Sequence, residues 1–118
     1  MSGEESQQGF ACSIDLSAEI AQLSMTRPWA KGFASTVLLK TSDLRLVLFA
    51  MQAGSQISKH HSPGRIVIHC LHGAIRLQLA AEARELREGG VFALDRKLEH
   101  DVHAQEDSVF LLTIVQPE

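Results

Sequence analysis

The chain of 118 residues has no tyrosine and a single tryptophan, Trp29. Surfaces that stack sugar rings or nucleic-acid bases need exposed aromatic faces, so this composition argues against such a surface. Lys and Arg form no cluster anywhere in the sequence, and the formal net charge is −3. Because nucleic-acid binding depends on basic groups that neutralise phosphates, we expect no nucleic-acid partner.

Long apolar runs and cysteine-rich patterns are also missing. No stretch approaches the roughly 18 consecutive apolar residues of a membrane-spanning helix, so we expect no membrane partner. The first ten residues, MSGEESQQGF, lack the basic-then-apolar order of a secretory signal, which makes the cytoplasm the expected location. The two cysteines, Cys12 and Cys70, form no C-x-x-C pair, which argues against a disulfide framework or a zinc ribbon. Cys70 lies in an apolar run, where we expect it to be a small buried side chain.

The length predicts one domain with a sizeable core. Residues 1–13 are polar and acidic and predict a flexible tail, which leaves 14–118 as a single domain. Residues 15–23 predict a short helix, because Leu16, Ile20 and Leu23 share one face, with Asp15 or Ser17 as its cap.

From Phe33 onward the apolar pattern changes to a period of two, which is typical of strands. The predicted strands cover residues 35–40, 44–51, 65–71, 75–79, 82–86, 91–94, 100–103 and 108–115. We expect 65–71 and 75–79 to form a hairpin across His72 and Gly73. Residues 82–86 look helical by propensity, but their place beside the preceding run favours a strand. Many short strands separated by turns predict an all-β sandwich or barrel.

Both alternating sets of side chains are apolar in the run 44–51, so a strand there would be buried on both faces. One face would point into the barrel. The other would meet a second sheet, the N-terminal helix or another subunit, and on this ground we expect a homodimer.

Histidine is abundant, with six residues in the chain, and four of them lie between His60 and His72. Two histidines that are separated by one intervening residue on a strand project from the same face. With a glutamate further along and a histidine from a neighbouring strand, they would complete a set of ligands that suits a divalent transition metal. By strand alternation we expect His69 and His103 to face away from such a site, and His72 to lie in a turn.

Two stretches are spaced like the two sequence motifs of the cupin superfamily. The first runs from Gly54 through His60, Ser62 and Ile66 to Gly73, and the second from Gly89 through Asp95, Lys97 and His100 to Ala104. The resemblance covers roughly residues 33–116. It implies a small RmlC-like cupin, which is an all-β, double-stranded β-helix of the jelly-roll type, here with a short N-terminal helix.

The metal-ligand positions of these motifs are only half filled. His60 and His100 match two of the four, whereas Ser62 replaces a histidine and Ile66 replaces the glutamate. Serine is a poor ligand and isoleucine is none, so the pair would hold a divalent ion (Fe, Mn, Ni, Cu or Zn) only weakly. His61 would need an irregular backbone to act as a third ligand.

The alternative for His60 and His100 is a polar role in the barrel cavity without a metal, hydrogen-bonded to each other, to Ser62 or to water. A mostly apolar cavity with a few polar groups suits a small organic ligand. The predicted cavity-lining residues are His60, Ser62, Ile66, Ile68, Phe92, Leu94 and His100.

Three functions fit these observations. The favoured one is a cupin without an identified catalytic residue that binds a small molecule in its barrel, with at most a weakly held metal. The second is a metal-dependent cupin enzyme of the dioxygenase or isomerase type. The third is a ligand-sensing regulatory module that acts through a partner. A barrel of this kind hosts many chemistries, so the fold does not choose among them.

Overall fold

The computed structural model describes residues 11–60 and 64–116, with residues 59 and 60 described by their backbone alone. One helix precedes nine strands in these residues. Their bounds are α1 Leu16–Ser24, β1 Phe33–Lys40, β2 Leu44–Met51, β3 Gln56–His60, β4 Arg65–His72, β5 Ala74–Gln78, β6 Ala83–Arg87, β7 Val91–Leu94, β8 His100–Ala104 and β9 Ser108–Val115. The predicted all-β class with a short N-terminal helix is confirmed.

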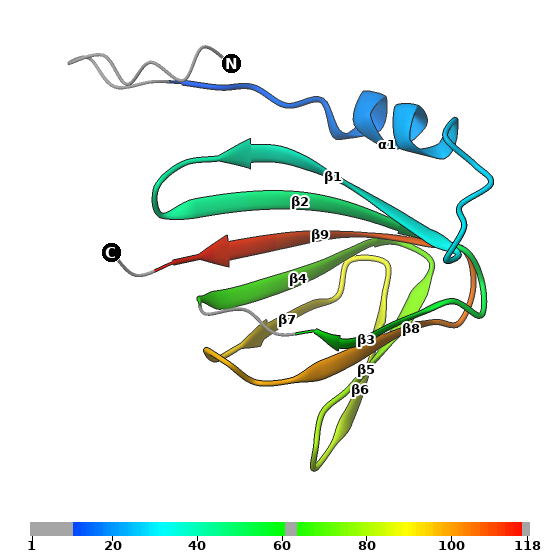
Figure 1. The fold of residues 1–118 in the computed structure, drawn as a ribbon, viewed down its shortest axis with the longest axis vertical. Coiled ribbons are helices and arrows are strands. Elements are labelled where there is room, and N and C mark those ends of the chain that lie inside the picture. Colours follow the sequence, from blue (N-terminus) through cyan, green and yellow to red (C-terminus); the bar gives the residue numbers. More distant parts are fainter. Residues whose placement is uncertain (1–10, 61–63, 117–118) are drawn as a thin grey trace.

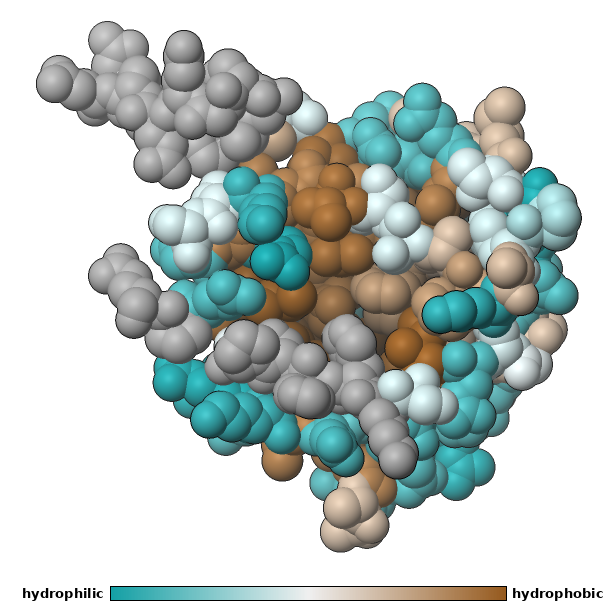
Figure 2. All heavy atoms as spheres, in the orientation of Figure 1, coloured by the Kyte–Doolittle hydropathy of each residue, from teal (hydrophilic) through white to brown (hydrophobic). Residues whose placement is uncertain are grey.

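The strands form two sheets that face each other (Figure 1). One sheet has the order β1-β2-β9-β4-β7 and the other has the order β3-β8-β5-β6. The core lies between them, since its buried side chains come from both sheets, Ile68 and Phe110 from the first and Ile75, Leu77 and Val102 from the second. In the same orientation, Figure 2 shows apolar side chains gathered in the middle of this face, with hydrophilic side chains around them.

The helix forms as its sequence predicts. Asp15 caps α1, because its carboxylate accepts a hydrogen bond from the backbone N–H of Ala18 at 3.2 Å. Leu23 is the buried residue of the helix, and it packs with Leu48 and Ala50 on the outer surface of the larger sheet. No helix among the described residues is long and apolar enough to cross a membrane.

The second apolar face of β2 is therefore covered by α1, which is one of the three alternatives left open by the sequence (Figure 1). The homodimer stays a prediction. By strand register, Val91 on β7 and Val115 on β9 lie on the same outer surface as Leu48, and they are 56% and 51% exposed.

The hairpin expected across His72 and Gly73 is wrong. Strand β4 pairs with β9 and β7, and β5 pairs with β6 and β8, so the chain crosses from one sheet to the other at Gly73. Each strand carries apolar side chains that need the core between the sheets, and this burial overrides the local turn signal. His72, expected in the turn, is the last residue of β4.

Strand β6 confirms the expectation for residues 82–86, because it pairs antiparallel with β5, and Leu86 lies opposite Ile75. The strand list drawn from the sequence omitted β3. The alternating pattern of β3 is short and ends at His60 and His61. In the sequence these two histidines indicate a ligand motif more clearly than the end of a strand.

Candidate functional site

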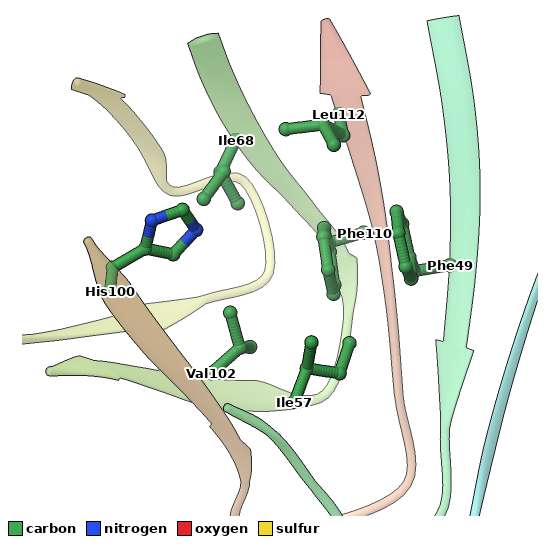
Figure 3. A pocket seen from close by; sticks show the side chains of 7 residues that line it. All are labelled: Phe49, Ile57, Ile68, His100, Val102, Phe110 and Leu112. Atoms are coloured by element: carbon green, nitrogen blue, oxygen red, sulfur yellow. The ribbon is translucent and has the colours of Figure 1, made fainter. Parts of the chain in front are cut away.

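The space between the two sheets contains a small apolar pocket. It is lined by seven residues, Phe49, Ile57, Ile68, His100, Val102, Phe110 and Leu112 (Figure 3). The cavity volume is about 10 Å³, so side chains nearly fill the interior. Among the described residues that line it, His100 is the one whose side chain can be charged.

His100 begins strand β8, and its residue is only 3% exposed. Its Nδ1 lies 3.4 Å from the carbonyl oxygen of Leu98, so a protonated Nδ1 can donate to that oxygen. Figure 3 shows the ring projecting from β8 into the space between the sheets, beside Ile68. Each ring nitrogen of an imidazole can donate or accept one hydrogen bond, so His100 brings hydrogen-bonding capacity to an otherwise apolar set of described lining residues.

The wall opposite His100 is aromatic. Phe49 on β2 and Phe110 on β9 stack with their ring centroids 4.8 Å apart and their planes within 3° of each other. The two residues are direct partners in the β2–β9 register, so their side chains share the inner face of the sheet. The pocket is therefore closed on one side by a flat apolar surface.

His100 also borders a larger hollow outside the pocket. This hollow has a volume of about 220 Å³ and is lined by Gln78, Leu79, Ala80, Glu99, His100 and Asp101. Gln78 and Asp101 face each other in the β5–β8 register, and Leu79 packs against the core. A molecule in the hollow would meet two carboxylates at its edge and the imidazole at the boundary with the interior.

The structure brings together some of the cavity residues expected from the sequence. Ile68 and His100 line the interior pocket. Ile66 is 3% exposed in the core beside the pocket, opposite Leu94 in the β4–β7 register. Phe92 is partly buried and packs against the same core without lining the pocket.

The remaining predicted ligands fall largely on residues that the structure does not describe. The backbone of His60 on β3 pairs with that of His100 on β8. His61 and Ser62 lie outside the described residues. His69 and His103 line neither the pocket nor the hollow, and both are half-buried.

Sequence reasoning missed several lining residues, namely Phe49, Ile57, Val102, Phe110 and Leu112. Two of them carried a usable signal. Val102 is two residues beyond His100 and must share its face, and Phe49 belongs to one of the two apolar sets of β2. The pairing of β2 with β9, which brings Phe110 to the pocket, is a long-range contact that alternation within one strand does not reveal.

Among the side chains that the structure describes, no group of three or more His, Cys, Asp or Glu is arranged to hold a metal ion. The side chain of His60 and residues 61–63 lie outside this description. Where the cupin motif has its glutamate, Ile66 fills the core with apolar atoms. The carboxylates nearest to His100 in sequence, Glu99 and Asp101, line the outer hollow and are absent from the lining of the pocket.

The second motif keeps its backbone shape with different residues. Lys97 stands at a glycine position of the motif and has a positive φ of 64°, a conformation that glycine adopts far more readily. Asp95, at the proline position, pairs with Arg65 at 2.9 Å, and both side chains are exposed. Arg65 is thus engaged by a carboxylate of this chain.

Comparisons with known proteins report on the fold. No protein-family model matches the chain. No curated protein matches it either. Among solved structures, a conserved protein of unknown function from Streptococcus pyogenes is 26% identical, with a TM-score of 0.73 over 92% of this chain and 90% of that one.

Two further structures are similar at lower identity. A cupin superfamily protein from Desulfitobacterium hafniense is 15% identical, with a TM-score of 0.72 over 80% of this chain and 87% of that one. A conserved protein with a double-stranded β-helix domain from Klebsiella pneumoniae is 18% identical, with a TM-score of 0.69 over 79% of this chain and 85% of that one. These likenesses confirm the barrel expected from the spacing of the two motifs.

Proposed function

We propose that this chain, a small cupin domain by its fold, binds an uncharged small organic molecule at His100. The observation that carries the proposal is the position of His100, which is 3% exposed and is the titratable side chain among the described residues of an otherwise apolar lining. A mostly apolar site with one or two oriented polar groups is the usual form of a small-molecule site.

The charges around His100 favour an uncharged ligand. Glu99 and Asp101 line the hollow that borders the imidazole. An anion there would meet two carboxylates, and the interior beyond His100 offers a charge no compensation. A neutral molecule with a hydroxyl or carbonyl group would exchange a hydrogen bond with His100 while its apolar part remains out of water.

The volumes limit the size of the ligand. The interior offers about 10 Å³ and the hollow about 220 Å³, which is below the roughly 300–1,000 Å³ of sites for drug-sized molecules. A molecule of one ring would occupy the hollow and place its polar group against His100. A movement of Leu79 or of the pocket side chains would let the edge of the ring enter the space between the sheets.

A pair of matched probes tests this proposal. Phenol and toluene have nearly the same shape and differ in one hydroxyl group. We expect phenol to bind about 3- to 10-fold more tightly than toluene, the equivalent of a hydrogen bond of about 0.5–1.5 kcal/mol, as measured by NMR shifts of the Ile68 and Val102 methyl groups.

The preference for phenol should disappear in His100→Leu and persist in His103→Leu. His103 is the matched control, because it lies on the same strand and does not line the pocket. Because the result is a ratio of two affinities for one variant, a loss of stability does not mimic it. Equal binding of the two probes to the wild type, or an unchanged preference in His100→Leu, would reject the proposal.

A weakly held divalent ion is the second candidate, and the β3–β8 register favours it by setting His60 opposite His100 along the backbone. A metal-dependent enzyme of the dioxygenase or isomerase type would require this ion. Elemental analysis of untagged protein tests it, with wild type compared with the His60→Ala/His100→Ala double variant. Near-stoichiometric metal that the double variant loses would support this candidate, and wild type that stays empty after incubation with Fe, Mn, Ni, Cu or Zn would end it.

A further inference from the structure

A second concave site lies on the outer side of the larger sheet, near the end of the barrel at which β4 ends and β9 begins. It is a groove of about 230 Å³, lined by Ser24, Arg27, Trp29, Ala50, Met51, His72, Asp107, Ser108 and Val109. It shares no residue with the pocket or the hollow at His100. The segment after α1, which Figure 1 shows leading from the helix to β1, supplies its Arg27 and Trp29.

A chain of contacts holds the charged residues of the groove in place. The hydroxyl of Thr26 donates to the carbonyl oxygen of Leu23 at 2.7 Å, and the indole Nε1 of Trp29 donates to the same hydroxyl oxygen at 2.8 Å. The guanidinium carbon of Arg27 lies 4.7 Å from the centre of the Trp29 ring, a cation–π contact. The Arg27 side chain is therefore oriented by the loop before any ligand arrives.

Asp107 completes the charged part of the groove. Its Oδ2 accepts from Nη2 of Arg27 at 3.4 Å, and its Oδ1 accepts from the backbone N–H of Ala53 at 2.8 Å. The hydrogen bond from Ala53, with a smaller contribution from Arg27, holds the pKa of Asp107 below its usual value, so the carboxylate is charged at neutral pH. The Arg27 and Asp107 side chains remain 41% and 64% exposed, within reach of a ligand.

The remainder of the lining is mixed. Ser24, His72 and Ser108 are polar, whereas Trp29, Ala50, Met51 and Val109 are apolar. Ala50 and Val109 are buried on the outer face of the larger sheet and lie beside the half-buried ring of Trp29, and Met51, whose side chain belongs to the core between the sheets, borders the groove at the end of β2. A positive and a negative group thus stand side by side at the edge of an apolar surface. A simple anion would be attracted by Arg27 and repelled by Asp107. A simple cation would be attracted by Asp107 and repelled by Arg27.

We propose that this groove binds a free α-amino acid with an apolar side chain. Its carboxylate would pair with Arg27, its ammonium group with Asp107, and its side chain would cover Ala50 and Val109. A molecule that carries both signs of charge can pair with both groups, whereas a simple ion is repelled by one of them. The volume of about 230 Å³ suits a molecule of this size, since it is smaller than the site of a drug-sized ligand. This proposal is independent of the function proposed for His100.

The fluorescence of Trp29 provides a direct measurement, because it is the only tryptophan and the chain has no tyrosine. The probes are leucine, isocaproate, which lacks the ammonium group, and isoamylamine, which lacks the carboxylate. We expect leucine to change the emission saturably and each analogue to bind at least tenfold more weakly. No saturable change with leucine, or an analogue that binds as tightly as leucine, would overturn the proposal on wild-type protein alone.

Variants then assign the contacts. Arg27→Gln and Asp107→Asn should each weaken leucine binding at least fivefold. Arg84→Gln, which removes an exposed arginine that pairs with Glu82 elsewhere on the surface, should leave it unchanged. His100→Leu should also leave it unchanged, and a loss of leucine binding in that variant would place the ligand in the barrel and reject the groove as its site.

Discussion

The two ends of strand β4 differ in what limits the choice of residue. At the carboxyl end, Gly73 has a φ of 83°, and a Cβ there would collide with the backbone oxygen of Asp107 and with the hydroxyl of Ser108. Near the amino end, Ile66 is 3% exposed and packs in the apolar core. Backbone geometry dictates the first residue, whereas the second only has to fill an apolar space.

This difference explains why the spacing of the two motifs is easier to recognise than their metal ligands. Gly54, Gly73 and Gly89 all have positive φ, and so does Lys97 at a motif glycine. These positions mark turns that the barrel needs, so the fold preserves their spacing. The ligand positions belong to the chemistry of the interior, and at one of them the barrel of this chain packs an apolar residue, Ile66, into its core.

The largest effect is expected for Gly73→Ala. The positive φ alone costs a residue with a Cβ about 1–2 kcal/mol, and the collision with the backbone of Asp107 and Ser108 adds about 1–3 kcal/mol. Gly54→Ala is the matched control, since its φ is 86° but no atom lies within 4 Å of a Cβ there. Urea denaturation should show that the free energy of unfolding falls by about 1 kcal/mol in Gly54→Ala and by several times more in Gly73→Ala. Equal losses would mean that the collision is relieved by movement of β9.

Ile66→Glu tests the other end of β4. A carboxylate buried among apolar side chains without a partner should lower the free energy of unfolding by about 3 kcal/mol at neutral pH. Because burial would raise the pKa of the new carboxyl group, part of the loss should be recovered as the pH falls towards 5. Ile66→Leu should cost less than about 1.5 kcal/mol, since it nearly conserves volume.

The same variant sharpens the question of a metal. If His60 and His100 can share an ion, Mn²⁺ or Zn²⁺ should stabilise Ile66→Glu measurably more than it stabilises Ile66→Leu in a thermal melt. Equal, small shifts for the two variants would show that the interior no longer fits an ion even when the carboxylate is restored.

Ser108 fixes the crossing at Gly73 by hydrogen bonds. Its buried Oγ accepts from the backbone N–H of Ala74 at 3.1 Å and lies 2.7 Å from the carbonyl oxygen of Glu106, to which its hydroxyl can donate. Ser108→Ala leaves the Ala74 N–H without this partner in a buried place, which should cost about 1–3 kcal/mol. Hydrogen exchange at Ala74 should accelerate correspondingly. Ser55→Ala, which removes a less buried hydroxyl bonded to Gln52, should cost less, and the reverse order would contradict the assigned role.

The contrast between the ends of β4 also separates what the sequence could predict from what it could not. Period-two alternation located seven of the nine strands among the described residues, and the place of residues 82–86 beside the preceding run located an eighth. The shared apolar face of residues 15–23, with Asp15 or Ser17 as its cap, located the helix. The crossing at Gly73 was mistaken for a hairpin, because a glycine turn between two apolar strands looks the same in sequence whether the strands pair or separate. Likewise, His100 was identified from its motif position, but its neighbours Phe110 and Leu112 depend on strand pairings far apart in the chain.

A smaller effect, and one of opposite sign, is expected at Lys97. Its φ of 64° costs a residue with a Cβ about 1–2 kcal/mol, and glycine would relieve this strain while losing about 0.5–1 kcal/mol of chain entropy on folding. Lys97→Gly should therefore stabilise the protein by about 0.5–1 kcal/mol in urea denaturation. Lys97→Ala keeps the Cβ and should bring no such gain, so stabilisation by both variants would point to the lysine charge instead of the backbone.

The smallest effect concerns Asp107, whose side chain joins the crossing at Gly73 to the loop at Ala53. Because the hydrogen bond from the Ala53 N–H lowers the pKa of Asp107, the ionised carboxylate stabilises the fold above its unfolded pKa of about 3.9. This contribution is lost as the pH falls through the lower folded value. The stability difference between wild type and Asp107→Asn should therefore be constant near neutral pH and shrink below about pH 4.

Salt separates the two sources of the lowered pKa. Salt at about 1 M screens the exposed Arg27–Asp107 pair but leaves the backbone hydrogen bond in place, so the stability difference should persist in salt. If salt abolishes the difference, Arg27 and not Ala53 is the main source of the lowered pKa.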